Sequence, residues 1–273
     1  MKRKPLALAW LPLLLLAISC SSGTLKVMSF NMRTSAKEDG KNSWEFRRGA
    51  TSAMLREVRP DVFGVQEAMP DQLEYITTTN PAYKCYGIGR DGDETGEHAS
   101  VFYNTRRLKL EDCGTWWLSE TPDTPSVGWD AKYPRTATWA LLRDKRGGKE
   151  FYFVNAHLDH KGAAARRNGL AMIVDKIREM NPDLPLVLVG DFNVRPEDSC
   201  LVALKGKMLD ARLTASETDS TFTCNGFRAP EKTIDYIYYN GFSAACKYEV
   251  ITTSFDNIPF ISDHYPIVTT FKY

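Results

Sequence analysis

The stretch Leu184-Pro-Leu-Val-Leu-Val-Gly-Asp-Phe-Asn193 decides how this sequence is interpreted. Its short apolar run is typical of a strand that is buried on both faces, and the run ends abruptly in polar residues. A carboxylate beside such a strand is costly to bury unless it is paired or bound to a metal. Asp191 and Asn193 are therefore candidate functional residues at the end of a central strand.

The same arrangement recurs along the chain. Polar residues end, begin or interrupt five other strand-like segments, and they comprise Asn31, Glu67, Asn155, His157, Asp235, Asp263 and His264. Oxygen and nitrogen ligands without cysteine favour a hard cation such as Mg²⁺, whose coordination shell a substrate phosphate can complete. The two histidines could transfer protons or stabilise charge on a phosphoryl group. Together the residues predict metal-assisted hydrolysis.

The body of the chain alternates between strand and helix patterns. Period-2 alternation and short apolar runs predict strands at 25–31, 61–67, 83–89, 99–104, 108–118, 135–144, 150–157, 184–191, 234–239, 247–254 and 266–272. Helical spacing of apolar residues predicts helices at 44–58, 71–78 and 163–180. Because no linker or repeat interrupts the sequence, we expect a single domain over residues 24–273. An α/β (α+β) fold with two sheets packed face to face and outer helices fits this pattern.

The N-terminus has the pattern of an export signal. Three basic residues, Lys2, Arg3 and Lys4, precede an apolar run that is too short for a membrane span. The run ends just before Cys20, as at a bacterial lipoprotein cleavage site. We therefore expect residues 1–19 to be a signal peptide and Cys20 to carry lipid. The alternative is a plain secretory signal. Either reading predicts an exported protein, and the first places it in the cell envelope, attached to a membrane on the periplasmic or cell-surface side.

Composition narrows the classes of protein. The chain has 273 residues, of which 43% are hydrophobic and 25% charged, with a net charge of +1. These values argue against a disordered or fibrous chain and against a strong global field for nucleic acid. The six cysteines form no C-x-x-C pair, which argues against a zinc ribbon. They are expected to be small buried hydrophobes, with up to two disulfides as the alternative. A monomer without an obligate protein partner is expected.

Six motifs in order along the chain resemble one known family. They are Ser-Phe-Asn31-Met-Arg, Val-Gln-Glu67-Ala, Val-Asn155-Ala-His157-Leu-Asp159, Gly-Asp191-Phe-Asn193, Ile-Asp235-Tyr-Ile and Ser-Asp263-His264-Tyr-Pro-Ile. Together they resemble the endonuclease/exonuclease/phosphatase superfamily, which has the DNase I-like fold. The resemblance implies a four-layer α/β sandwich in which two packed mixed β-sheets are flanked by helices. It also implies a site at one edge of the packed sheets.

The resemblance implies metal ligands. Glu67 would be the main Mg²⁺ ligand, with Asn31 beside it and Asp263 near the metal; Mn²⁺ is the expected substitute. Arg33 stands where some nucleases of the superfamily carry an acidic residue. That departure puts a second metal position in doubt, and Arg33 is expected to engage an anionic substrate instead.

The resemblance also implies catalytic roles. Asp191 would orient or deprotonate the attacking water, and Asn193 would hold the water or a phosphate oxygen. Asp235 and His264 would form a carboxylate–imidazole pair, in which His264 acts as a base or as a cation on the phosphate. His157 would contact the scissile phosphate or help to protonate the leaving oxygen.

Other residues are expected around the substrate. Arg135 and Asn155 are assigned to substrate binding, since a guanidinium group suits bidentate contact with phosphate. Glu97 would orient His157, or else lie in a solvated loop. His98 and His160 are expected to be ordinary loop histidines.

The sequence leaves the kind of phosphoester open. Aromatic residues in the predicted loops could stack on bases or sugars, insert into lipid, or fill the core, and they are Trp44, Trp116, Trp117, Trp129 and Tyr133. Short basic runs weaken the case for a processive nuclease. We expect an Mg²⁺-dependent phosphoesterase that acts on a sugar-, lipid- or nucleotide-type phosphate ester. An exonuclease or endonuclease is the alternative, and a non-catalytic phosphate-ligand binding protein is a remote one.

Overall fold

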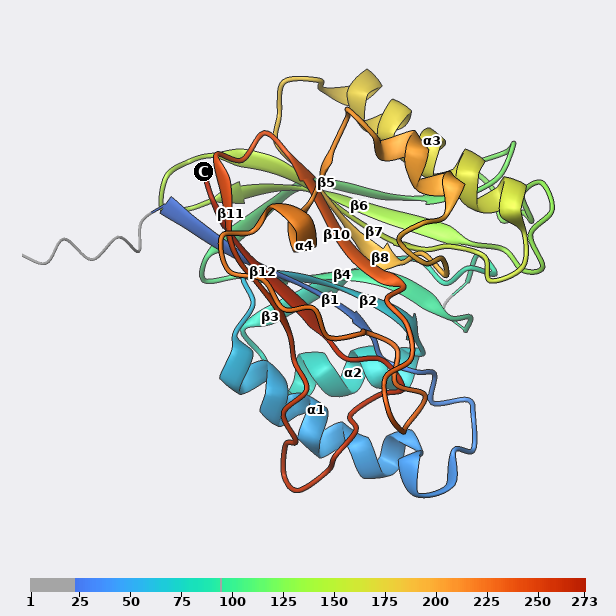
Figure 1. The fold of residues 1–273 in the computed structure, drawn as a ribbon, viewed down its shortest axis with the longest axis vertical. Helices are drawn as coiled ribbons and strands as arrows, with labels where there is room; N and C mark the ends of the chain where they lie inside the picture. Colours follow the sequence, from blue (N-terminus) through green and yellow to red (C-terminus); the bar gives the residue numbers. More distant parts are fainter. Residues whose placement is uncertain (1–22, 94) are drawn as a thin grey trace, which may run out of the picture.

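Two six-stranded β-sheets pack face to face at the centre of the molecule, and helices cover the outer face of each (Figure 1). The computed structural model describes residues 23–93 and 95–273. The predicted signal peptide over residues 1–19 and the predicted lipid site at Cys20 lie outside the described residues. The four-layer sandwich of mixed sheets that the sequence predicted is confirmed.

Both sheets are mixed. The first runs in the order β11 (Ala244–Val250), β12 (Ile267–Lys272), β1 (Thr24–Asn31), β2 (Val62–Ala68), β4 (His98–Asn104) and β3 (Tyr83–Tyr86). The second runs in the order β5 (Leu108–Trp117), β6 (Thr136–Asp144), β7 (Glu150–His157), β8 (Leu186–Asp191), β10 (Asp235–Asn240) and β9 (Leu209–Asp210). β1 pairs with β2 in parallel, as β7 does with β8, and the other paired strands are antiparallel.

Three apolar clusters hold the layers together. α1 (Trp44–Val58) and α2 (Pro70–Thr79) cover the first sheet, and α3 (Ala163–Met180) covers the second (Figure 1). Most apolar residues of the predicted helical stripes are buried against the sheets, but Phe46 near the start of α1 and Met180 at the end of α3 are exposed. The cluster between the sheets includes Val27, Val101, Phe153, Val189 and Ile267. Short 3₁₀ turns at Gly40–Asn42 (η2) and Ser199–Leu204 (η3) and the single-turn α4 (Ala211–Thr214) complete the described elements.

Gly64 allows the two sheets to approach each other. A Cβ atom at this position of β2 would lie 2.5 Å from Cγ of Asn155 and 2.7 Å from Cγ2 of Val189, both in the facing sheet. Cβ atoms do not approach other atoms so closely, so only glycine fits here without displacing a strand.

Strand direction explains why the polar residues meet. Asn31 and Glu67 lie at the ends of the parallel strands β1 and β2. His157 and Asp191 are register partners at the ends of the parallel strands β7 and β8. Asp235 begins the antiparallel β10 and pairs with the same Asp191. Because these strands all end or begin at one edge of the sandwich, their polar residues gather there.

The observed elements differ from the prediction mainly at short or irregular segments. The strand predicted at 247–254 is β11 at Ala244–Val250, and a register shift between Ala245 and Lys247 breaks its alternation. The strand predicted at 83–89 ends at Tyr86. β9, α4 and the two 3₁₀ turns were not predicted, because segments of two to six residues carry no readable period.

Most of the cysteines among the described residues are only partly buried. Cys200 is buried, whereas Cys85, Cys113, Cys224 and Cys246 are half-buried. Cys200 therefore fits the expectation of a small buried hydrophobe better than the other four do. Over residues 23–93 and 95–273, no helix has the length and apolar character that a membrane crossing requires.

Candidate active site

Asp191 lies at the centre of the polar cluster. Its Oδ2 accepts a 3.0 Å hydrogen bond from Nδ2 of Asn31, and its Oδ1 accepts a 2.8 Å bond from the backbone N–H of Asn193. The same Oδ2 is 3.7 Å from Nε2 of His157 and 3.8 Å from Nε2 of His264. Burial raises the pKa of Asp191, although the nearby His264 opposes the shift. A buried carboxyl with a raised pKa is suited to accept a proton at neutral pH.

Asp235 is hydrogen-bonded to His264 through the ring nitrogen that faces away from Asp191. The Nδ1 atom of His264 lies 3.0 Å and 2.9 Å from the two carboxylate oxygens of Asp235, so Nδ1–H donates and Nε2 faces Asp191. Burial alone would lower the pKa of His264, but the charge and hydrogen bond of Asp235 raise it well above its ordinary value. His264 is therefore an imidazolium cation near neutral pH.

The hydroxyl of Thr223 supports the pair of Asp235 and His264. Thr223 Oγ1 donates a 2.5 Å hydrogen bond to Oδ2 of Asp235 and accepts bonds from the backbone N–H groups of Ile234 and Asp235. Thr223 and Asp235 are both buried. Because the threonine occupies one oxygen of the carboxylate, it fixes the orientation of Asp235 behind the imidazole.

His157 has the opposite charge state. Nδ2 of Asn193 lies 3.1 Å from Nε2 of His157 and donates a second bond of 3.0 Å to the carbonyl of Leu158. With the amide oriented to donate both bonds, Nε2 of His157 is an acceptor and carries no proton. Burial, together with the positive charges of Arg135 and His264, lowers the pKa of His157 well below its ordinary value. The site therefore pairs one neutral and one cationic histidine across Asp191.

Three residues at this edge have a left-handed backbone. The φ angles are +54° at Arg33, +58° at Glu67 and +55° at Asn193. Such φ values are unfavourable for residues other than glycine and asparagine, and in native proteins they cluster at functional sites. Here they turn the chain sharply as it leaves β1, β2 and β8, which directs side chains into the space at the strand ends.

The acidic residues fit a divalent cation. Ligand atoms of Glu67, His157 and Asp191 lie within 4.8 Å of one another. Nδ2 of Asn31 donates to Oε1 of Glu67 (3.0 Å) and to Asp191, so one amide bridges two carboxylates. Burial raises the pKa of the neighbouring Asp263, and the charge of Glu67 raises it further. Clustered carboxylates that offer oxygen atoms suit a hard cation, which would relieve their repulsion.

Asn31 lies beside Glu67, as predicted, and hydrogen-bonds its carboxylate. Its Oδ1 accepts a 3.0 Å bond from the backbone N–H of Arg33, and its Nδ2 faces the two carboxylates. In this arrangement Asn31 orients Glu67 and Asp191 through its amide nitrogen, and its predicted place beside the metal stays a prediction.

A cleft of about 470 Å³ opens above these groups. Its lining includes Glu67, His157 and Asn193 from the strand ends, together with Arg33, Thr34, Lys37, Arg90, Glu97, Tyr133, Arg135 and His160. This volume is typical of small-molecule sites. The exposed ring of Tyr133 stacks on His160 with centroids 6.0 Å apart, and the Arg90 guanidinium lies 5.1 Å from the centroid of the Tyr133 ring. The cleft thus combines cationic and aromatic groups.

Arg33 and Arg135, which were predicted to bind substrate, both line the cleft, and each guanidinium group is paired with a carboxylate. Arg33 makes bonds of 2.9 Å through Nε and Nη2 to both oxygens of Asp39, and its Nη1 is 3.6 Å from Oδ2 of Asp263. Nε of Arg135 is 3.3 Å from Oδ2 of Asp159. Both arginines line the cleft, where their remaining donors can reach an anion.

Two other predictions are not supported by the geometry. Asn155 was assigned to substrate binding but is completely buried between the sheets. Its Nδ2 donates to the carbonyls of Val65 (2.8 Å) and Ser100 (2.9 Å), and its Oδ1 accepts a 2.6 Å bond from Nε2 of Gln66. Its hydrogen-bonding capacity is therefore used to join the sheets, and no ligand can reach it.

Glu97 is the second residue whose predicted role the geometry does not support. It was expected to orient His157, but its carboxylate makes a 2.7 Å ion pair with Nη1 of Arg90. Burial raises the pKa of Glu97, and Arg90 opposes the shift. Glu97 lines the cleft, so it contributes to the site by fixing Arg90 rather than the histidine.

Residues that hold the loops around the site in place were not predicted from the sequence. Arg47 is completely buried and donates to four backbone carbonyl groups, those of Met32, Arg33, Asn42 and Ile261. Burial lowers the pKa of Arg47 to about 10, so the residue remains cationic at neutral pH. A guanidinium group that satisfies loop carbonyls carries no local sequence signal, because its acceptors are backbone atoms from distant segments.

The predicted loop aromatics divide between core and cleft. Trp116 and Trp117 are buried at the end of β5, and Trp44 is buried at the start of α1. Trp129 is half-buried. Tyr133 is the aromatic residue of this group that lines the cleft.

Comparison with known proteins identifies the family. A model described as the Endonuclease/Exonuclease/phosphatase family matches residues 28–264. The chain belongs to the endonuclease/exonuclease/phosphatase family. The match includes every residue of the polar cluster from Asn31 to His264. Members of this family are metal-dependent phosphoesterases. As a member, the chain is a phosphoesterase, that is, a hydrolase of ester bonds.

Individual relatives of this phosphoesterase cover almost its whole length. The solved mannosyl-6-phosphatase of Bacteroides thetaiotaomicron VPI-5482 is 32% identical, with a TM-score of 0.87 over 91% of this chain and 100% of that chain. An endonuclease/exonuclease/phosphatase from Bacteroides vulgatus is 32% identical, with a TM-score of 0.86 over 91% and 98% of the two chains. A 5′-tyrosyl-DNA phosphodiesterase of Caenorhabditis briggsae is 24% identical over 91% of this chain and 69% of that protein.

Proposed function

We propose that this phosphoesterase is an Mg²⁺-dependent phosphomonoesterase that releases phosphate from a phosphorylated sugar. The observation that carries the proposal is the cleft of about 470 Å³ above Glu67 and His157. A sugar phosphate fits such a space, with its phosphate over the strand ends and its ring beside Tyr133. The mannosyl-6-phosphatase that matches this chain end to end supports the choice of substrate class.

The residues at the strand ends suit hydrolysis at phosphorus. As the water oxygen bonds to phosphorus, the carboxylate of Asp191, whose pKa is raised, accepts the proton that the water loses. The bond from phosphorus to the sugar oxygen breaks, and that oxygen takes up a proton from solvent in the cleft. The cationic His264 lies on the same side, 3.8 Å from Asp191, and stabilises the negative charge that develops on the phosphoryl oxygens. Asn193 can donate from its amide to a phosphate oxygen in the cleft, and the neutral His157, whose Nε2 accepts from that amide, keeps it in position.

Glu67, with Asp191 and Asp263 close by, is the group that would hold Mg²⁺. A cation held there would supply Lewis-acid polarisation of the phosphoryl group and would neutralise part of its charge. Asn31 keeps the carboxylates of Glu67 and Asp191 oriented toward a common point. The preference for Mg²⁺ over softer metals follows from an oxygen-rich set of ligands, and Mn²⁺ is expected to substitute.

Paired charges in the cleft weigh against a nucleic-acid substrate. Arg33, Arg90 and Arg135 each make an ion pair with a carboxylate, to Asp39, Glu97 and Asp159 respectively. A long polyanion is bound mainly through cations that neutralise its phosphates, and paired arginines supply less of that charge. The experiment must therefore distinguish a phosphomonoesterase from a nuclease.

The test compares a phosphomonoester with a phosphodiester. The chain without residues 1–19 is incubated with Mg²⁺ and either mannose 6-phosphate or a short single-stranded oligonucleotide. We expect phosphate release from the sugar, loss of turnover with EDTA, recovery with Mg²⁺ or Mn²⁺, and loss in Glu67→Gln. Glu179→Gln on the exposed end of α3 is the matched control. Cleavage of the oligonucleotide with no release from mannose 6-phosphate would contradict the proposal.

We also propose that the protein is exported and anchored through lipid on Cys20, and that it acts as a monomer. The basic and apolar pattern of residues 1–19 supports export. Radiolabelled palmitate should enter the wild-type protein and not Cys20→Ala, and the variant should leave the membrane fraction. Equal labelling of both proteins would exclude Cys20 as the anchor. Light scattering of the soluble chain measures its oligomeric state.

A further inference from the structure

The first described residue and the last lie side by side, at the end of the sandwich opposite the active site (Figure 1). The backbone N–H of Tyr273 donates a 3.0 Å bond to the carbonyl of Gly23, and Thr24 is the register partner of Lys272. β1 runs from this end to Asn31 in the polar cluster. The eight residues of β1 separate the two ends by about 25 Å.

Exposed cations gather at the end that carries Gly23. Lys149 Nζ lies 5.6 Å from the centroid of the Tyr273 ring. Nζ of Lys145 donates a 2.6 Å bond to the carbonyl of Thr105, in the loop before β5. The buried Arg107 of this loop donates to the carbonyl of Thr24, which joins the loop to the start of β1. We call the exposed cations around these contacts the basic face, and they are Arg106, Lys145, Arg146, Lys149 and Lys272.

Acidic side chains between the strands at this end are already paired. Asp61 and Asp144 lie 3.3 Å and 2.6 Å from the guanidinium nitrogens of Arg107. Glu150 lies 2.7 Å from Nη2 of Arg143. Because Arg107 and Arg143 are not members of the basic face, these carboxylates do not use its charges.

Exposed acidic residues at this end belong to the outer helical layers. They include Glu57 in the last turn of α1, Glu179 in the last turn of α3, and Asp183 after α3. Without the three N-terminal cations, the chain has more acidic than basic residues. The basic face therefore concentrates positive charge at one end, against the balance of the whole chain.

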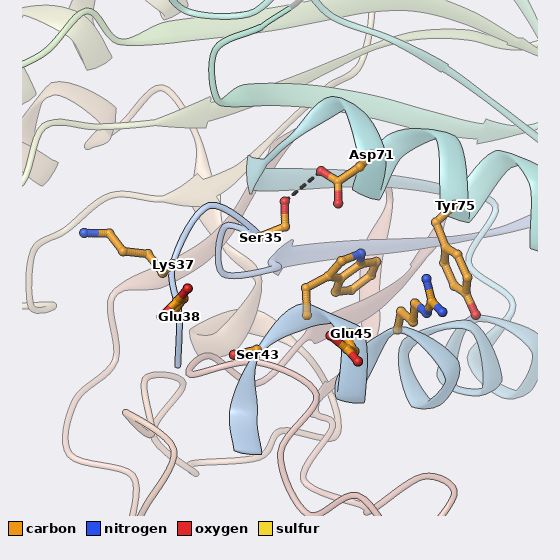
Figure 2. Close-up of a pocket in the computed structure, with 9 residues that line it drawn as sticks. Ser35, Lys37, Glu38, Ser43, Glu45, Asp71 and Tyr75 are labelled. Atoms are coloured by element: carbon orange, nitrogen blue, oxygen red, sulfur yellow. Dashed lines mark hydrogen bonds between the residues drawn. The ribbon is translucent and has the colours of Figure 1, made fainter. Parts of the chain in front are cut away.

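Charges at the catalytic end are mixed instead. The arginines that line the cleft are paired with carboxylates, as described above. A pocket of about 410 Å³ lies where α1 and α2 begin, and Figure 2 shows Glu38, Glu45 and Asp71 in its lining. Lys37 and Arg48 line the same pocket. The two ends of the sandwich therefore differ in charge, and the basic face lies at the end without the cleft.

Chain length limits how far this end can lie from a lipid on Cys20. Gly23 is the third residue after Cys20, and three fully extended residues span about 11 Å at most. The catalytic edge lies about 25 Å farther along β1. A membrane surface that contains anionic lipid attracts exposed Lys and Arg side chains. The tether and the charge therefore select the same end of the molecule.

We propose that the basic face docks on anionic lipid headgroups of the membrane that anchors the protein, so that the catalytic cleft opens away from that membrane. The orientation of the cleft rests on the lipid anchor and the phosphoesterase site of the proposed function, whereas docking of the basic face needs neither. The inference narrows the substrate class: phosphate esters reach the cleft from solution, and headgroups of the anchoring membrane do not.

A sedimentation assay tests the docking without lipidation or turnover. The chain without residues 1–19 is mixed with vesicles of phosphatidylcholine, alone or with an equal amount of phosphatidylglycerol. We expect binding to the anionic vesicles that weakens as the salt concentration rises. Lys145→Gln and Lys149→Gln should each weaken this binding about fivefold. Lys41→Gln, at an exposed position of the catalytic end, is the matched control.

Three outcomes of this assay would overturn the docking. The first is equal binding to both kinds of vesicle, and the second is an equal loss of binding in Lys41→Gln. The third is binding to heparin without binding to the vesicles, which would assign the basic face to an anionic polymer.

Energy transfer tests the orientation of the lipid-modified full chain. The protein is reconstituted in the same anionic vesicles, with a fluorophore on a non-canonical amino acid at residue 147 or 41 and an acceptor on the lipid headgroups. Gly147 lies in the turn between β6 and β7, where a Cβ meets nothing within 4 Å. Transfer should be stronger from residue 147 than from residue 41, and equal or reversed transfer would overturn the orientation.

These measurements separate failure of this inference from failure of the proposed function. Neither uses turnover, so both decide the inference even if mannose 6-phosphate is not hydrolysed. If Cys20 carries no lipid, the proposed anchor fails and the orientation fails with it, while the sedimentation assay still supports or overturns docking of the basic face.

Discussion

Asn31, at the end of one sheet, donates a 3.0 Å hydrogen bond to Asp191, at the end of the other. The same Nδ2 also donates 3.0 Å to Oε1 of Glu67. A single buried amide therefore couples the two halves of the sandwich at the point where the chemistry takes place. The distance between the sheets, set in the core, determines the position of the carboxylates.

Replacing Asn31 with alanine should weaken metal binding without unfolding the protein. Both carboxylates lose their shared donor, and such outer partners typically contribute about 10–100-fold to metal affinity or activity. Turnover measured against Mg²⁺ concentration should show a requirement raised by that factor. Asn168→Ala on α3 is the matched control. An unchanged Mg²⁺ requirement would mean that the carboxylates orient themselves without Asn31.

The two histidines should show opposite protonation states at neutral pH. In ¹⁵N NMR of the metal-free protein at pH 7, His157 should be neutral with an unprotonated Nε2, and His264 should carry both protons. The pKa of His157 is lowered first by burial, whereas Asp235 raises that of His264. Asp235→Asn should therefore move the titration of His264 to lower pH. Identical titration of both histidines near pH 6.5 would contradict the geometry described here.

Gly64→Ala should destabilise the protein by forcing the sheets apart. The new Cβ would meet Asn155 at 2.5 Å and Val189 at 2.7 Å, and overpacking of this kind typically costs about 1–3 kcal/mol. Denaturant unfolding measures the change. Gly49→Ala on α1, where a Cβ meets nothing within 4 Å, is the control and should be neutral or stabilising. Equal effects of the two substitutions would show that the sheets can separate freely.

The buried ion pair of Asp144 with Arg107 should make stability depend on acid pH. Nη2 of Arg107 is 2.6 Å from Oδ2 of Asp144. Burial opposes ionisation of Asp144, but the hydrogen bond from Arg107 lowers its pKa overall. Since the folded pKa is below the unfolded value of about 3.9, the pair contributes its full stability above that pH and loses it as pH falls through the folded pKa.

Asp144→Asn tests this linkage. It should cost about 2 kcal/mol of unfolding free energy at pH 7, because Arg107 loses a charged hydrogen-bond acceptor but keeps Asp61 at 3.3 Å as a second partner. The difference between wild type and variant should shrink as the pH falls below about 4. Asp123→Asn, at an exposed position, provides the reference. A difference that stayed constant down to pH 2 would exclude this carboxylate as the titrating group.

The sequence was most informative where local pattern and chemistry coincide. The apolar run before Asp191 predicted both β8 and the polar residues at its end, because the chain must stop burying side chains where the sheet ends. Family motifs then located Glu67, His157 and His264, which the structure brings together at one edge. The parallel pairing of β1 with β2 and of β7 with β8 supplies the physical reason.

The sequence was least informative about hydrogen bonds between distant segments. Thr223 supports Asp235 and Gln72 supports the loop after β1, but a threonine or glutamine is locally indistinguishable from a surface residue. Asn155 shows the reverse case. Its motif suggested a ligand contact, yet only the packing of both sheets reveals that its amide is fully used inside the core.

The left-handed backbone at Glu67, with φ of +58°, sets two selective pressures against each other. Glycine would adopt this conformation without steric cost and should relieve about 1 kcal/mol of strain, but it offers no carboxylate. Selection for thermal stability alone would therefore drive the position away from glutamate, and only selection for turnover would keep it. A library enriched for stability and one enriched for activity should diverge at residue 67.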